Sequence, residues 1–221
     1  MTLTASDNGG GDFKKVPEGT HQAVCDMVVD LGNQVTEYNG EKSIKSQVFI
    51  RWQVPSMRVQ YTDKDGNEVE GPMSIGKVYT NSLSEKANLR KDLQGWRNRA
   101  FTKDELKGFD IRKVAGTCCQ IIVTHREGRN GNVYANVTGV AGWPGGLPRI
   151  EAEGETVIYS GEDNVGSLEK LPKWLREKVE NQATGQELYD DRDQYLNGAQ
   201  PSAHPPAGGH PADFDDQEIP F

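Results

Sequence analysis

Hydrophobic and polar positions alternate along several stretches of the chain, which is the pattern of β-strands with one buried face. The run Ala23, Cys25, Met27, Val29 and Leu31 is apolar at every second residue, as expected for a strand that lies against a core. Strands are predicted over five ranges, which are 20–31, 45–54, 75–80, 117–125 and 133–140.

Turn and helix signals separate the predicted strands. Asn-Gly pairs at 39–40 and 130–131 are typical of type I′ hairpin turns, because Asn and Gly tolerate a positive φ. Asp-Gly at 65–66 indicates a further hairpin. A helix is predicted over 85–98 with Ser84 as its N-cap, since a hydroxyl at that position accepts a hydrogen bond from the first turn.

About five strands, with a helix between the third and the fourth, is the order of an OB-fold barrel. We therefore predict a mainly β domain, a five-stranded OB-fold barrel, at residues 16–143. A flexible leader is predicted over 1–15, a linker with a short amphipathic helix over 144–183, and a disordered acidic tail over 184–221. The short helix is expected to begin at Pro172, since proline disrupts a helix interior.

Charge is distributed unevenly along the chain. Residues 1–143 carry 19 Lys and Arg against 17 Asp and Glu, a net +2, whereas residues 144–221 carry 6 against 16, a net −10. The acidity therefore belongs to the tail, and the body remains compatible with a polyanionic ligand. No apolar run approaches the roughly 20 residues that span a bilayer, so we expect a soluble, cytoplasmic protein.

Three of the predicted strands carry an aromatic residue among cations or amides. Phe49 shares a strand face with Lys45 and Arg51, Lys77 shares one with Tyr79, and the last hairpin adds further cations and a tyrosine. Exposed aromatics stack on nucleic-acid bases, worth about 1–3 kcal/mol per base, while cations follow the phosphates. The predicted surface for single-stranded DNA comprises Lys45, Phe49, Arg51, Lys77, Tyr79, Arg126, Arg129 and Tyr134.

The same aromatics have an alternative interpretation as packing residues half-buried under loops. Trp52 and Trp96 fall on apolar faces, which predicts that both lie in the core. Arg97 and Arg99, at the end of the predicted helix, are candidate cations for the rim of a groove or members of a solvated face. The three cysteines form no paired motif and are predicted to be reduced core thiols.

The last nine residues form the most specific motif of the chain. Acidic residues surround one phenylalanine and lead into a terminal Ile-Pro-Phe, so a partner can bind the ring in an apolar pocket and the carboxylates on a basic rim. This tip resembles that of bacterial and phage single-stranded DNA-binding proteins, with Gln217 and Glu218 where the family has aspartates. The predicted partner-binding residues are Asp213, Phe214, Asp215, Asp216, Glu218, Ile219, Pro220 and Phe221.

The body, from Pro17-Glu18-Gly19-Thr20 through Leu89-Arg90-Lys91-Asp92-Leu93 to Val137, resembles phage-encoded members of the same class. The resemblance implies an OB-fold, no catalysis, no cofactor, and a role in phage DNA replication, recombination or repair in the bacterial cytoplasm. It implies single-stranded DNA and replication or recombination proteins as partners. Homo-oligomerisation stays open.

Two other functions remain as alternatives. The first is a protein-interaction adaptor or inhibitor, which would place the tip in a host pocket without binding DNA. The second is a metal-dependent nuclease that uses Asp104, Glu105 and Asp110, although nothing in the sequence sets their geometry. The run at 63–67 is similar to the start of a calcium loop but has Ser74 where the twelfth position requires glutamate, so a turn is predicted there.

Overall fold

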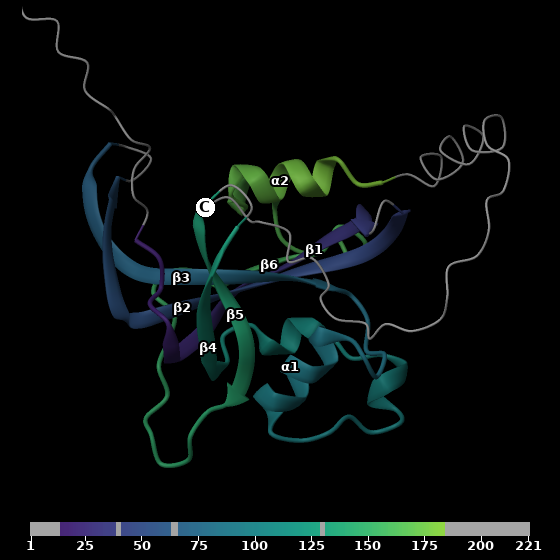
Figure 1. Ribbon diagram of the computed structural model, residues 1–221, viewed down its shortest axis with the longest axis horizontal. Coiled ribbons are helices and arrows are strands. Elements are labelled where there is room, and N and C mark those ends of the chain that lie inside the picture. The colour runs from purple at the N-terminus through teal and green to yellow at the C-terminus, as the bar shows by residue number, and fades with distance from the viewer. Residues whose placement is uncertain (1–13, 39–40, 63–65, 129–130, 184–221) are drawn as a thin grey trace, which may run out of the picture.

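The computed structural model describes residues 14–38, 41–62, 66–128 and 131–183. It contains an antiparallel sheet with a sixth strand added to it, two α-helices and three short 3₁₀ helices (Figure 1). The strands are β1 (Gly19–Tyr38), β2 (Glu41–Thr62), β3 (Glu68–Thr80), β4 (Cys118–Glu127), β5 (Val133–Gly142) and β6 (Val157–Tyr159). The helices are α1 (Asn88–Arg97), η1 (Glu105–Lys107), η2 (Ile111–Val114), η3 (Leu168–Lys170) and α2 (Lys173–Glu180).

The strands follow the order β3-β2-β1-β4-β5, and β6 pairs with β1 in parallel. The prediction of a mainly β fold with a helix between the third and fourth strands is confirmed. The predicted barrel is not closed, because no ladder joins β3 to β5 in the described part of the chain. A side chain spans the two strands instead, since Lys77 Nζ donates to the carbonyl of Val137 at 2.9 Å.

The first core cluster lies between the inner face of the sheet and α1. Alternate residues of β2, which are Val48, Ile50, Trp52 and Val54, point into it, as their alternation predicts. Trp52 packs against Trp96 of α1 with ring centroids 5.8 Å apart, so both tryptophans lie in the core as predicted.

A second core cluster lies on the opposite face of the sheet. Met27, Val29, Leu31 and Phe49 form its base, and Leu175 of α2 covers them. Figure 1 shows α2 on one side of the sheet and α1 on the other. The segment predicted to be a linker, residues 144–183, therefore packs on the domain for much of its length.

One of the two α-helices begins where the sequence predicts, and the other does not. α2 begins directly after Pro172, which occupies its N-cap, as predicted. α1 begins at Asn88 with Ala87 as N-cap, so the predicted cap at Ser84 is wrong. Ser84 belongs to a preceding turn, in which its carbonyl accepts a hydrogen bond from the Ala87 amide at 3.0 Å.

The three cysteines are free and buried in the domain, as predicted. Burial raises the pKa of the Cys25 thiol and of the Cys119 thiol, because the apolar surroundings disfavour the charged thiolate. Both groups are therefore neutral packing residues at physiological pH.

Candidate functional site

Phe49, predicted to be an exposed stacking residue, is only 2% exposed. Its alternation with Ile50 is as predicted, but α2 covers the face to which it points. Trp174 of α2 contacts the Phe49 ring edge-on, with centroids 5.1 Å apart and planes at 88°. A base therefore cannot stack on Phe49 in this structure, and the predicted exposure is wrong.

Arg51, predicted to contact phosphates on that same face, is held by a carboxylate. Its Nη2 lies 2.7 Å from Asp26 Oδ2, and its Nε also donates to Asp26. Gln53 donates to the same carboxylate at 3.0 Å and to the Glu153 carbonyl. This network ties β1 and β2 to the segment that covers them, so the charge of Arg51 is compensated within the protein.

Lys77 and Tyr79 point to the inner face of the sheet, not to a surface shared with Phe49. The register pairs Phe49 with Val78, which puts Lys77 and Tyr79 on the opposite, core-facing side. Tyr79 is 3% exposed, and its hydroxyl donates to Asp92 at 2.8 Å. Lys77 forms an ion pair with Asp92 at 3.0 Å. The prediction that these two residues lie on a DNA-binding surface is therefore wrong.

The remaining predicted cations and the last tyrosine have varied positions. Lys45 is half-buried and lies opposite Gln34 in the β1–β2 pair. Arg126 and Tyr134 face each other across the β4–β5 pair, with Arg126 exposed and Tyr134 half-buried. The structure thus brings one predicted cation and one predicted aromatic together. Arg129 and the partner-binding tip at 213–221 lie outside the described residues.

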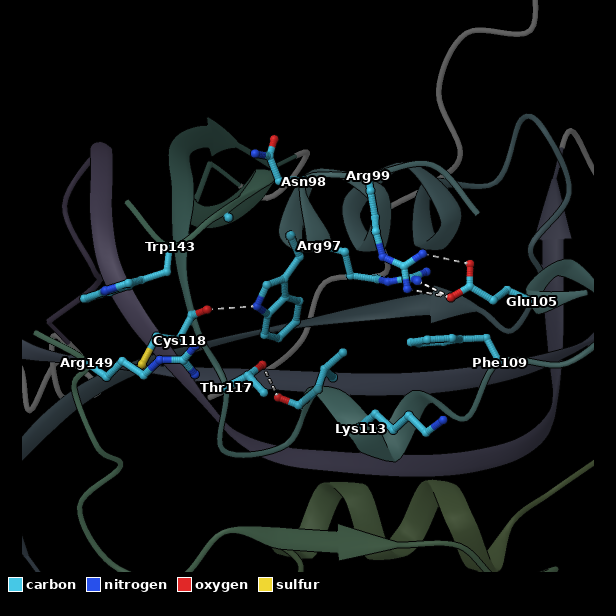
Figure 2. A pocket seen from close by; sticks show the side chains of 13 residues that line it. Arg97, Asn98, Arg99, Glu105, Phe109, Lys113, Thr117, Cys118, Trp143 and Arg149 are labelled. Carbon is cyan, nitrogen blue, oxygen red and sulfur yellow. Dashed lines mark hydrogen bonds and ion pairs between the residues drawn. The ribbon is translucent and has the colours of Figure 1, made fainter. Parts of the chain in front are cut away.

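A cleft of about 520 Å³ opens at the end of α1, and we call it the helix-end cleft. It is bounded by the last turn of α1, the 3₁₀ segments, the start of β4 and the residues after β5 (Figure 2). Its lining residues are Trp96, Arg97, Asn98, Arg99, Glu105, Phe109, Lys113, Val114, Thr117, Cys118, Gly142, Trp143 and Arg149.

Two glycines allow α1 to lie against the end of β5 beside this cleft. A Cβ atom on Gly95 would be 2.2 Å from the Val140 carbonyl oxygen, and one on Gly142 would be 3.1 Å from the Trp96 carbonyl oxygen. Asn98 then ends the helix in the left-handed region, with φ of 52°. The chain direction changes there, which directs Arg99 away from the helix and towards the cleft.

Aromatic side chains form part of the cleft lining. The indole of Trp96 donates to the Cys118 carbonyl at 3.1 Å, which fixes its edge at the cleft. Trp143, directly after β5, is half-buried and donates to the Leu147 carbonyl at 3.2 Å. The guanidinium carbon of Arg97, Cζ, lies over the Phe109 ring, 4.8 Å from the ring centroid. Large π-surfaces therefore occur in the same cleft as the cations.

The cleft carries four cationic side chains and one carboxylate, Glu105. Arg97 and Arg99 both pair with Glu105. Arg149 is exposed and makes no hydrogen bond or ion pair with any residue that the structure describes. Figure 2 shows Trp143 and Arg149 on one side of the cleft and Arg99 with Glu105 on the other. The cleft is therefore electropositive.

Glu105 is expected to stabilise the fold in a pH-dependent way. The Thr102 amide donates to it at 2.9 Å and both arginines pair with it, which lowers the pKa of Glu105 to about 2 from its ordinary 4.5. A carboxyl whose pKa is lowered by folding stabilises the fold above its ordinary pKa, and that contribution disappears as pH falls towards the lowered value.

Glu105→Gln should therefore be less stable than the wild type at pH 7. The difference should shrink as the pH falls from about 5 to 2, the interval between the ordinary and the lowered pKa. Urea unfolding of both proteins at several pH values measures this. A stability difference that does not change over that interval would show that the carboxylate contributes nothing through its charge.

Most residues of the helix-end cleft are not predicted from the sequence. Arg97 and Arg99 are predicted as candidate rim cations, but no sequence pattern assigns a role to Phe109, Lys113, Trp143 or Arg149. Trp143 is the last residue of the domain predicted at residues 16–143, and it stands in a Gly-Trp-Pro-Gly-Gly run. An aromatic residue directly after a strand was the available signal, since a plain linker does not require a large hydrophobic side chain.

The three carboxylates of the nuclease alternative each pair with a cation. Asp104 pairs with Lys107, Asp110 pairs with Arg112, and Glu105 pairs with two arginines of the cleft. Among the described residues, no group of three or more His, Cys, Asp or Glu side chains is arranged to hold a metal ion.

The sequence matches no protein-family model, and no curated protein matches it. Within the described ranges, the structure contains no helix that is both long enough and apolar enough to cross a membrane.

Proposed function

We propose that this chain binds single-stranded DNA without sequence preference and recruits replication, recombination or repair proteins through its C-terminal tip. The observation that carries the proposal is the helix-end cleft, where four cations and only one carboxylate surround aromatic rings. Cations that follow phosphates and rings that stack on bases are the two components of sequence-tolerant binding of single strands.

The sheet supports an OB-type assignment. The β1–β2–β3 meander, the helix α1 and the β4–β5 hairpin follow in the order of an OB-fold, and β1 pairs with both β2 and β4. The described residues contain no β3–β5 ladder, so the sheet is not closed into a barrel there. Lys77 and its bond to the Val137 carbonyl lie at the gap.

The net charge of residues 144–183 makes the sheet face that carries Phe49 and Arg51 an unfavourable place for DNA to bind. Residues 144–183 contain five Lys and Arg and eight Asp and Glu, a net charge of −3. Much of this segment lies over the face on which Phe49 and Arg51 were predicted to bind DNA. A segment of net negative charge repels phosphates, so we propose that the single-stranded DNA binds on another surface of the domain.

The β4–β5 hairpin offers a continuous path instead. Arg126 pairs with Tyr134 towards one end of the hairpin, and the cleft adjoins Cys118 and Gly142 at the other. Eight residues of extended strand separate Arg126 from Cys118, about 26 Å at 3.3 Å per residue. We propose that a single strand follows this hairpin face between the two positions.

Oligo(dT) binding tests the proposal directly. Three cations along this path, Lys113, Arg126 and Arg149, form no ion pair within the described part of the chain. Each neutralised phosphate contributes about −0.7 to the slope of the logarithm of the DNA association constant against the logarithm of the salt concentration. Three neutralised phosphates therefore give an expected slope of about −2. Fluorescence titrations at several salt concentrations measure the slope. Absence of binding at low salt would favour the adaptor function.

The tip should act independently of the DNA path. Phe221→Ala removes the aromatic anchor but leaves every acidic side chain, so partner recruitment should be lost while oligo(dT) affinity stays nearly unchanged. Deletion of 213–221 should also remove a tethered polyanion and raise DNA affinity, most clearly at low salt. Co-purification of partners and oligo(dT) titration measure the two effects. Normal recruitment by Phe221→Ala would refute the role of the tip.

A further inference from the structure

We propose that the helix-end cleft is a pocket for one nucleotide of the bound DNA, with the base on Trp143 and the phosphate at Arg149. The inference rests on the proposed function for the origin of that nucleotide. It adds a defined site that recognises a nucleoside monophosphate, in contrast to a diffuse basic surface.

The size of the cleft sets the number of nucleotides. Pockets that enclose small molecules measure roughly 300–1,000 Å³, and the helix-end cleft measures about 520 Å³. A cleft of this size accommodates one base with its sugar and phosphate, not a run of several nucleotides. Neighbouring nucleotides would therefore continue along the outside of the domain.

The aromatic residues of the cleft differ in how much ring surface is available for a base to stack on. Trp96 is buried in the core and contributes only its edge, and Phe109 is already covered by Arg97. Trp143 is half-buried, and its indole nitrogen is anchored to the Leu147 carbonyl. It has a fixed ring with accessible surface, which makes it the stacking position.

The cations also differ in their availability. Glu105 engages Arg97 and Arg99, so these two guanidinium groups mainly set a positive potential. Arg149 is exposed and has no partner within the described ranges. Lys113 forms no ion pair there either, but Figure 2 shows it near Phe109, on the other side of the cleft from Arg149 and Trp143. A phosphate of the nucleotide stacked on Trp143 can therefore bind at Arg149 without breaking an existing ion pair.

The experiment compares dTMP, thymidine and inorganic phosphate as ligands of the full-length protein, using calorimetry and tryptophan fluorescence. We expect dTMP to bind at least tenfold more tightly than thymidine or phosphate, because only dTMP supplies both the base and the phosphate. Arg149→Ala should weaken dTMP binding about tenfold or more. Trp143→Leu should weaken it by about fivefold or more and remove the fluorescence change.

Arg126→Ala is the matched control, because Arg126 is an exposed arginine outside the cleft. It should leave dTMP affinity unchanged while weakening oligo(dT) binding. Equal dTMP affinity in the wild type, Arg149→Ala and Trp143→Leu would overturn the proposed nucleotide pocket. Binding of a peptide that contains acidic and aromatic residues, together with no binding of dTMP, would overturn it as well.

The outcomes also separate this inference from the proposed function. Oligo(dT) binding that both cleft variants retain in full would overturn the nucleotide pocket and leave the DNA-binding function intact. Binding of dTMP by a wild-type protein that does not bind oligo(dT) would support the pocket and refute the DNA-binding function.

Discussion

A chain that ends at residue 143 is expected to be unfolded, although it contains all five strands of the predicted barrel. Truncation there removes the segment that covers Met27, Val29 and Phe49 on the outer face of the sheet. Burial of one Leu or Val side chain stabilises a protein by about 1.5–3 kcal/mol, and three such residues of the segment, Leu171, Leu175 and Val179, are buried. Together these three side chains contribute about 4.5–9 kcal/mol. A loss of that size is comparable with the whole stability of many domains.

A chain that ends at residue 183 is the control, because it keeps every residue of the second core cluster. We expect its thermal unfolding to match that of the full-length protein. Leu175→Ala in the full chain should cause an intermediate loss of about 2–5 kcal/mol. Circular dichroism melts compare all four proteins. Cooperative melting of the 1–143 chain within a few degrees of the full chain would show that the covering segment adds little stability.

The second large effect is expected at Asp92, a buried carboxylate on α1. It accepts hydrogen bonds from Lys77 Nζ at 3.0 Å and from the Tyr79 hydroxyl at 2.8 Å. The Lys77 side chain is only 13% exposed, so Asp92→Ala would leave its charge poorly solvated and without its counterion. Removal of one partner from a buried ion pair costs about 3–5 kcal/mol.

Asp104→Ala is the matched control for Asp92→Ala. Asp104 also pairs with a lysine, Lys107 at 2.8 Å, but both of these side chains are exposed. Surface ion pairs contribute only about 0–1 kcal/mol, so this variant should be nearly as stable as the wild type. Chemical unfolding measures both losses. Similar small losses in the two variants would contradict the structural role that we assign to Asp92.

The face of β2 that carries Phe49 shows how far alternation can predict a surface. The period of two correctly separates Phe49 and Arg51 from Ile50 and Trp52. It contains no information about what covers either face. The cover comes from α2, more than 120 residues later along the chain, and this contact depends on tertiary packing.

β3 shows a second limit of the same reasoning. Alternation correctly places Lys77 and Tyr79 together and opposite Val78, but one strand alone does not show which side is the core. The register between β2 and β3 determines that, because it pairs Val78 with Phe49. Lys77 can occupy a core-facing position because it has a buried partner there, Asp92. A hydrophobicity pattern predicts a polar position of this kind to be exposed.

The sequence by itself determined five of the six strands, β1 to β5, though not their full lengths. It also determined the helix between the third and fourth strands, the start of α2 after Pro172 and the core positions of Trp52 and Trp96. These depend on periodicity, on backbone preferences of Gly and Pro, and on side-chain hydrophobicity, all of which act locally. Only the tertiary structure decided which sheet face is covered, which cations are already paired, and that Trp143 and Arg149 share a cleft with Arg99. Those outcomes require contacts between segments far apart in the chain, whose geometry is determined only when the whole domain packs.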